Sequence, residues 1–210
     1  MRGLFITLEG PDGSGKSTAL KLIGNYLETK GIEFTVTREP GGTEIGEEIR
    51  HIILDEKNNN MSIETEALLY AAARGQHVHE KILPALERGE IVVCDRFLLS
   101  SLAYQGVGRG LGIEEVKAIN DFAIRGVEPD LVLFFHVDPE LTLERKTGKL
   151  GGDRLEKAGA DFHKTVYEGY MKLLNMYPKN IKVIDASKSI EEVFNQSIRE
   201  VENLLRKEGE

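Results

Sequence analysis

The stretch that decides the fold is Gly10-Pro11-Asp12-Gly13-Ser14-Gly15-Lys16-Ser17, which matches G-x-x-x-x-G-K-[ST] without a departure. A short apolar run, Leu4–Leu8, precedes it, and a helical pattern begins near Lys16. Glycines let backbone N–H groups curl around phosphate oxygens, and the start of a helix attracts anions. The motif therefore predicts a phosphate-binding loop over Gly10–Thr18, in which Lys16 reaches the β- and γ-phosphates of a nucleotide and Ser17 binds Mg²⁺.

Four further segments have the pattern of β-strands, at Phe34–Thr37, Ile91–Cys94, Leu131–Val137 and Ile181–Ile184. They are separated by helical patterns, of which the longest cover residues 65–86 and 190–205. The runs at 91–94 and 131–135 are continuously apolar, as in strands that helices cover on both faces. We therefore predict an α/β fold of the P-loop NTPase type, with three layers and a five-stranded parallel sheet flanked by helices. The 210 residues predict a single domain, 1–210.

Composition excludes several classes of protein. The longest apolar run is far too short to cross a bilayer, and the formal charge of −8 disfavours attraction to duplex nucleic acid. The single cysteine, Cys94, rules out an internal disulfide framework. We expect a soluble, cytoplasmic protein with no membrane or nucleic-acid partner.

The end of the third strand carries the next indication of chemistry. Asp95 follows the run Ile-Val-Val-Cys and is suited to hold Mg²⁺, either directly or through water. Arg96 comes next, where open α/β sheets place their ligands, and it can bind a second phosphate. The chain has no N-K-x-D motif, which disfavours a GTPase.

Other side chains are candidates for contacts to a base or sugar. Ser101, Tyr104 and Gln105 share one face of a predicted helix. Tyr70 and Arg74 form an i,i+4 pair that would suit a flat heterocycle, but the residues alone favour a core tyrosine beside a surface arginine. Arg38, in Arg-Glu-Pro-Gly-Gly-Thr, either contacts an acceptor phosphate or belongs to an ordinary turn.

A basic, glycine-rich stretch at residues 145–156, Arg-Lys-Thr-Gly-Lys-Leu-Gly-Gly-Asp-Arg-Leu-Glu, separates two helical patterns. It contains almost no apolar residues and predicts a short mobile lid.

Taken together, these motifs resemble bacterial thymidylate kinase. The resemblance runs nearly end to end, through REPGGT (38–43), YAAAR (70–74), DRFLLSSLAYQG (95–106) and DRLE (153–156). It implies an enzyme that phosphorylates dTMP to dTDP with ATP and Mg²⁺, in the synthesis of dTTP, and it implies a homodimer. Two other functions stay open from the residues alone: a kinase for another small acceptor, and a nucleotide-gated switch without acceptor turnover.

The resemblance also implies a role for each matched residue. Asp12 meets the deoxyribose 3′-hydroxyl and orders the metal site, and Arg38 and Arg96 hold the dTMP phosphate. Tyr70 stacks on thymine, Arg74 contacts its O4, and Ser101 or Gln105 reads its N3 edge. Tyr104 crowds the 2′ carbon and so selects deoxyribose.

The catalytic residues implied are Lys16, Arg96, Arg154 and Asp12. Gly13 leaves the phosphate loop uncharged at that position, while the lid carries Arg145, Lys146, Lys149 and Arg154. This is similar to the lid-basic arrangement of the family, in which Arg154 closes over ATP and Arg145 also contacts its phosphates.

Overall fold

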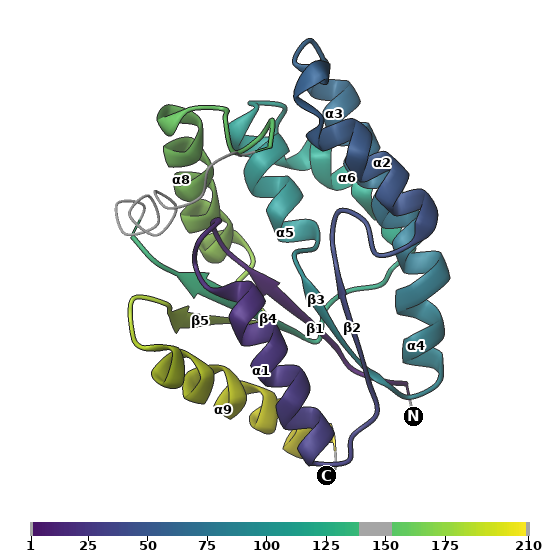
Figure 1. Ribbon diagram of the computed structural model, residues 1–210, viewed down its shortest axis with the longest axis vertical. Helices are drawn as coiled ribbons and strands as arrows, with labels where there is room; N and C mark the ends of the chain where they lie inside the picture. Colours follow the sequence, from purple (N-terminus) through teal and green to yellow (C-terminus); the bar gives the residue numbers. More distant parts are fainter. Residues whose placement is uncertain (1, 139–152, 209–210) are drawn as a thin grey trace.

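The structure is a computed structural model that describes residues 2–138 and 153–208, and its centre is a sheet of five parallel strands (Figure 1). The strand order is β2-β3-β1-β4-β5, with β1 in the middle. A parallel sheet of five strands flanked by helices confirms the predicted α/β fold. Each strand lies within one residue of the sequence segment that predicted it. The strands are β1 (Phe5–Glu9), β2 (Phe34–Arg38), β3 (Ile91–Asp95), β4 (Leu131–His136) and β5 (Ile181–Asp185).

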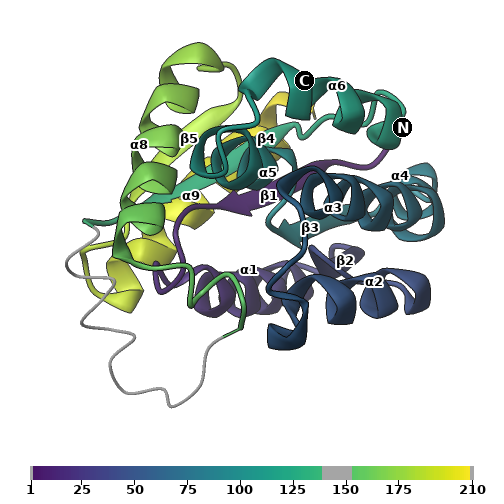
Figure 2. The same cartoon turned by 90° about the horizontal axis from the view of Figure 1, so that it is seen from above.

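Helices cover both faces of this sheet. Figure 2 shows α1 and α9 on one side and α3, α5 and α6 on the other. The helical elements are α1 (Lys16–Thr29), α2 (Glu44–Leu54), η1 (Glu56–Asn58), α3 (Ile63–His77), η2 (Val78–Ile82), α4 (Leu83–Glu87), α5 (Leu98–Ser101), η3 (Leu102–Gly108), α6 (Ile113–Ile124), α8 (Ala160–Met176) and α9 (Ile190–Glu208).

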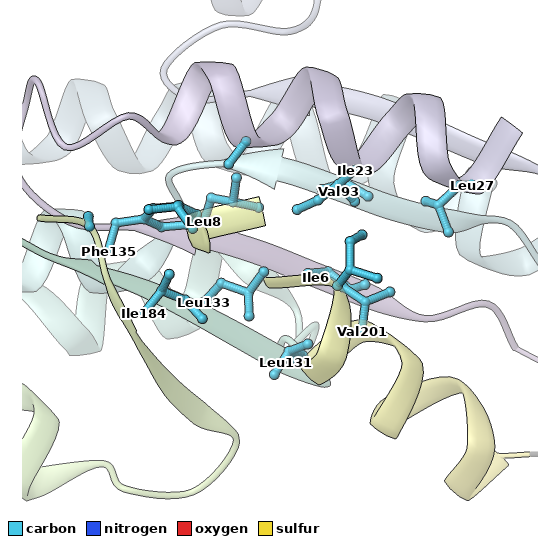
Figure 3. Close-up of a cluster of buried hydrophobic side chains, with 14 of the residues drawn as sticks. Ile6, Leu8, Ile23, Leu27, Val93, Leu131, Leu133, Phe135, Ile184 and Val201 are labelled. Atoms are coloured by element: carbon cyan, nitrogen blue, oxygen red, sulfur yellow. The ribbon is translucent and has the colours of Figure 1, made fainter. Parts of the chain in front are cut away.

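The two faces of the sheet bury different side chains of the same strands. Ile6 and Leu8 of β1 pack with α1 and α9 in one cluster (Figure 3), whereas Phe5 packs with η2 and α4 in another. In β4, Leu133 lies in the first cluster and Phe134 faces α8 and η3. Because helices cover both faces of the inner strands, β1, β3 and β4 are buried almost throughout. The edge strands β2 and β5 are only partly buried, and they expose Val36 and Val183.

The helix predicted over residues 65–86 is not a single regular helix. It begins as α3, widens into the π-helical segment η2, and continues as α4. Pro84 lies in the first turn of α4. Proline has no N–H to donate to the preceding turn and its ring crowds that turn, which is consistent with the interruption of the regular helix just before it.

The parallel sheet brings the carboxyl ends of all strands to one edge. Glu9, Arg38 and Asp95 end β1, β2 and β3 there, and the loop Gly10–Gly15 starts from the middle of that edge. The edge at the strand ends is therefore where the predicted site residues meet.

Within the described residues, none of the helices has the length and apolar character that a membrane span requires.

Candidate active site

The loop between β1 and α1 has the backbone that the motif predicted. Gly10, Gly13 and Gly15 all have positive φ, at 136°, 81° and 92°. A Cβ on Gly10 would lie 2.6 Å from the carbonyl oxygen of Phe135, so a side chain there would collide with β4. Glycine is required at this point because the chain turns tightly against the neighbouring strand.

Lys16 begins α1 and points its amine back into the loop. Its Nζ donates to the carbonyl oxygens of Gly10 and Pro11 at 3.0 and 2.8 Å, and the side chain is buried. Burial, reinforced by the nearby charge of Arg96, lowers the pKa of Lys16 to about 8. The first turn of α1, Lys-Ser-Thr-Ala, contains no acidic residue to compete for an anion.

Two oxygen donors lie side by side at the start of α1 and the end of β3. The Ser17 hydroxyl donates to Oδ2 of Asp95 at 3.1 Å. The other carboxylate oxygen, Oδ1, is buried and has no hydrogen-bond partner among the residues that the structure describes. A buried carboxylate oxygen beside a hydroxyl fits Mg²⁺, which takes one or two protein oxygens and fills its remaining positions with phosphate and water.

Arg96 occupies the centre of the site, directly after β3. Its φ of 70° is in the left-handed region, and its guanidinium contacts Asp12 at 2.5 Å, Ser100 at 2.9 Å and Tyr170 at 3.1 Å. Burial alone would lower the pKa of Arg96, but Tyr104 and Asp12 outweigh it and raise the pKa. Tyr104 also donates to Asp12 at 3.1 Å, which joins three predicted site residues in one network.

Glu9 lies beneath Arg96 and holds the turn that presents it. The buried carboxylate accepts from the backbone N–H of Phe97 at 2.9 Å and from the Ser100 hydroxyl at 2.5 Å. Burial raises the pKa of Glu9 to about 7, against the opposing effects of the Ser100 hydrogen bond and the charge of Arg96. The hydrogen bonds from Phe97 and Ser100 to Glu9 thus hold the backbone that keeps Arg96 in its left-handed conformation.

A pocket opens beside Arg96, between α3, the α5–η3 segment and residues 153–156. Arg74 is buried at its inner wall, donating to Glu39 at 2.7 Å, to Ser101 at 3.0 Å and to the Phe97 carbonyl at 3.0 Å, with a further bond to Asn120. The pocket lining includes seven of the eight residues predicted to bind the acceptor: Asp12, Tyr70, Arg74, Arg96, Ser101, Tyr104 and Gln105.

Comparison with known proteins identifies the family. The family model "Thymidylate kinase" matches residues 8–197. A thymidylate kinase of Finegoldia magna is 60% identical over 93% of this chain and 96% of its own length. Those of Clostridium novyi and Lactobacillus helveticus are 52% and 53% identical, over 93% and 98% of this chain and 96% and 98% of theirs. The chain belongs to the thymidylate kinase family. The predicted resemblance is therefore confirmed.

Arg38 is the one predicted acceptor ligand that does not line the pocket of this thymidylate kinase family member. Its guanidinium is bound to both carboxylate oxygens of Glu47, each at 2.9 Å, and to the Pro40 carbonyl at 2.7 Å. Arg50 donates to the same carbonyl at 3.1 Å and does line the pocket. Arg38 is thus linked to the pocket by its hydrogen bond to Pro40, which lines the pocket wall.

Arg154 lies within the described residues, and its side chain is buried against α3. Its guanidinium donates to Glu66 at 2.6 Å and to the Ile53 carbonyl at 2.8 Å. The neighbouring residues 153, 155 and 156 line the acceptor pocket. Arg145, Lys146 and Lys149 lie outside the described residues, as does most of the predicted lid.

Sequence reasoning missed several residues of the site. Arg50 was not singled out, because an arginine on an amphipathic helix carries no signal of its own. Glu9 and Glu66 were missed because their importance comes from burial, which a charged residue's identity does not predict. A hollow beside the loop was missed as well; its lining includes Gly13, Gly15, Thr18, Lys188, Ile190 and Phe194.

Proposed function

We propose that the loop Gly10–Thr18 holds ATP and that the pocket beside Arg96 holds dTMP, so that the γ-phosphoryl group passes between them. Conversion of dTMP to dTDP with ATP is the activity of the family to which the chain belongs. The observation that carries the assignment of residues is the joining of both sites through Asp12. It belongs to the loop and also binds Arg96 and Tyr104 on the pocket side.

The hydrogen bonds of Arg74 support a carbonyl group as its ligand. A guanidinium has five N–H donors, and protein partners occupy four: Nε bonds Glu39, Nη1 bonds Ser101 and Asn120, and Nη2 bonds the Phe97 carbonyl. One N–H of Nη2 is left for the pocket. Since guanidinium can only donate, it suits O4 of thymine and would oppose the amino group of cytosine.

Ser101 and Gln105 supply complementary groups to the same base edge. The Ser101 hydroxyl already accepts from Arg74, which leaves its own O–H to donate. Gln105 donates its amide to Glu66 at 3.0 Å, and its carbonyl oxygen bonds no residue that the structure describes. We therefore assign the thymine N3–H to the carbonyl of Gln105 rather than to Ser101.

The remaining pocket residues suit a sugar and a phosphate. Arg96, with Arg50 and the nearby Arg38, supplies positive charge for the acceptor phosphate. Asp12 lies where it can accept from a 3′-hydroxyl, and Tyr104 closes the space next to it. In this arrangement Tyr70, at the pocket wall, stacks on the base.

The donor side uses the loop, Lys16 and the metal pair. Lys16 exchanges its two loop carbonyls for β- and γ-phosphate oxygens, and the hollow lined by Lys188 and Ile190 receives the adenosine part. Ser17 and Asp95 are the residues that would hold Mg²⁺, which when bound neutralises developing charge on the phosphates.

Transfer then requires positioning more than covalent help. The acceptor phosphate is already an anionic nucleophile, so no general base is needed. Lys16 on the donor side and Arg96 on the acceptor side face the transferred group, and the network through Asp12 sets their spacing. Arg154 is held by Glu66 here; in the family's lid-basic arrangement it would contact ATP, which would require it to leave that carboxylate.

We also propose a homodimer in the cytoplasm. Helix α3 packs against α2 and against α6, and the three helices expose large apolar side chains: Phe122 is 90% exposed, Leu68 56% and Ile45 53%. A second copy of the chain would cover this face. The cytoplasmic location rests on the single, buried Cys94 and the lack of any need for oxidising conditions.

The deciding experiment is an ADP-release assay with ATP and Mg²⁺, in which dTMP, dUMP, dCMP, dGMP, AMP and ribo-TMP are offered separately. We expect turnover that depends on the acceptor and strongly favours dTMP, with dTDP identified by chromatography. Equal turnover of dCMP would contradict the base-edge assignment. ATP binding without acceptor-dependent ADP release would contradict the kinase and support a nucleotide switch.

A further inference from the structure

Glu66 of α3 lies behind the acceptor pocket and is almost completely buried, at 1% exposed. Its Oε1 accepts from the Gln105 amide at 3.0 Å and from Nε of Arg109 at 3.2 Å. Its Oε2 accepts from Nη2 of Arg109 at 3.1 Å and from Arg154 at 2.6 Å. One buried carboxylate therefore faces two guanidinium groups and one amide.

These neighbours keep Glu66 ionised. Burial alone would raise the pKa of its carboxyl group, but the hydrogen bonds from Arg109 and Gln105, with the charge of Arg109 and a bond from Arg154, hold the pKa below its usual range. An ionised carboxylate has no proton and can only accept hydrogen bonds. Whatever faces it must be a donor.

This constraint determines how the amide of Gln105 is turned. A glutamine amide has a donating nitrogen and an accepting oxygen of nearly equal size, and either can point toward a neighbour. Against Glu66 only the nitrogen can form a bond. The oxygen must then face the other way, and no residue in the described part of the chain occupies it, although Gln105 lines the pocket.

We propose that Glu66 is a specificity-determining positioning residue: its carboxylate fixes the Gln105 amide so that a carbonyl oxygen, and not an NH₂ group, meets N3 of the acceptor base. This inference rests on the proposed function. Thymine and uracil carry a hydrogen on N3 and match that acceptor, whereas cytosine has a lone pair on N3 and would be repelled by it. Glu66 therefore contributes to discrimination without touching the base.

The test replaces the carboxylate by its neutral, donating counterpart, Glu66→Gln. A glutamine at position 66 can donate as well as accept, so Gln105 is free to turn over. We expect the ratio of kcat/KM for dTMP to that for 5-methyl-dCMP to fall by about 10-fold or more, because one buried hydrogen bond of correct polarity is lost. The two acceptors share the methyl group, sugar and phosphate, and differ at positions 3 and 4 of the base.

Two controls separate this role from simple structural support. The ratio of dTMP to dUMP should stay the same in Glu66→Gln, since both bases present the same N3–H and O4. Arg109→Lys keeps a positive charge beside Glu66, so the carboxylate stays ionised even when Arg154 leaves it to contact ATP, and we expect this variant to keep the wild-type ratio of dTMP to 5-methyl-dCMP.

A double-mutant cycle completes the test. In a Gln105→Ala background, Glu66→Gln should no longer change the ratio of dTMP to 5-methyl-dCMP, because the group that Glu66 orients is gone. Should Glu66→Gln fail to fold alone, the same comparison is made between Arg109→Met and Glu66→Gln/Arg109→Met, in which less buried positive charge is left unpaired.

Loss of kcat/KM by the same factor for every acceptor, with unchanged ratios, would overturn the proposal and make Glu66 a structural residue. That outcome differs from failure of the proposed function, which would appear in the wild-type chain as no preference for dTMP over 5-methyl-dCMP or no kinase activity.

Discussion

Lys16 combines two properties that act against each other. Its amine must carry a positive charge to bind phosphate, yet burial, reinforced by the charge of Arg96, lowers its pKa to about 8 while the amine bonds groups of the loop. A bound polyphosphate adds negative charge next to the amine and raises its pKa again. The protonation state of Lys16 is therefore linked to nucleotide binding.

We predict that kcat/KM for ATP falls above about pH 8, because kcat/KM reports the free enzyme, in which Lys16 loses its proton there. At saturating ATP the lysine is already paired with phosphate, so kcat/KM for dTMP should hold to higher pH. Steady-state profiles from pH 6 to 10 measure both. A parallel fall of the two parameters at pH 8 would contradict this explanation.

The raised pKa of Glu9 predicts that the stability of the fold decreases as the pH rises. In the unfolded chain its pKa has the ordinary value of 4.5, and in the fold burial raises it to about 7. Between these values the native state holds a proton that the unfolded state has lost, so the contribution of Glu9 to stability decreases as the pH rises. The groups that face it are Arg96, Arg74, Ser100 and Tyr170.

We therefore predict that Glu9→Gln, which mimics the protonated acid, gains stability relative to wild type between pH 5 and pH 8. The gain should be about 3 kcal/mol, since each pH unit between the two pKa values corresponds to about 1.4 kcal/mol. Urea denaturation of both proteins at the two pH values measures it. A constant difference between the two proteins would contradict a raised pKa at Glu9.

The residues of the site differ in how far sequence could predict them. The phosphate loop has a contiguous motif with its own backbone chemistry, so Lys16 and Ser17 are identified directly. Tyr70 and Arg74 are ambiguous by spacing, and only the family resemblance places them in the pocket. The bond of Arg154 to Glu66 joins segments that are far apart in the sequence, and the bond of Arg38 to Glu47 depends on how the end of β2 packs against α2. No local sequence pattern encodes either contact.

Among the elements, the strands were predictable because each is a short run rich in β-branched or aromatic residues between turns. The inner strands are also buried on both faces. The π-helical segments η2 and η3 were not, because an extra residue in a helical turn leaves the apolar periodicity nearly intact. This affects Ser101, Tyr104 and Gln105. They do line one pocket, but the turn that carries them is wider than the α-helix assumed from their spacing.

The end of α6 offers a test at this scale. The helix ends at Ile124, and Arg125 follows with φ 53° and ψ 38°, a left-handed conformation that an exposed arginine adopts at a cost. We predict that Arg125→Gly stabilises the protein by about 0.5–1 kcal/mol, since glycine adopts this conformation without strain. Arg125→Ala keeps the strain and should give no gain. Urea denaturation compares the three, and equal loss from both substitutions would contradict the prediction.

At the scale of the whole molecule, the apolar face of α2, α3 and α6 predicts the oligomeric state. We expect the wild-type chain to be dimeric by light scattering, and Phe122→Glu to be monomeric, because a charge within an apolar interface must be desolvated. Val183→Glu is a matched control: Val183 is 56% exposed on β5 and lies on none of these helices, so its substitution should leave the dimer intact. A monomeric wild type would contradict the proposal.

The central position of β1 also determines the order of events during synthesis of the chain. Phe5 pairs with Val92 and Ile6 with Leu131, so the first strand to leave the ribosome is joined by its sheet neighbours only when β3 and β4 have been translated. At typical rates of translation that delay is on the order of ten seconds. For that time the apolar segment of β1 in the nascent chain is without its sheet neighbours, and it is a natural target for chaperones that bind emerging polypeptides.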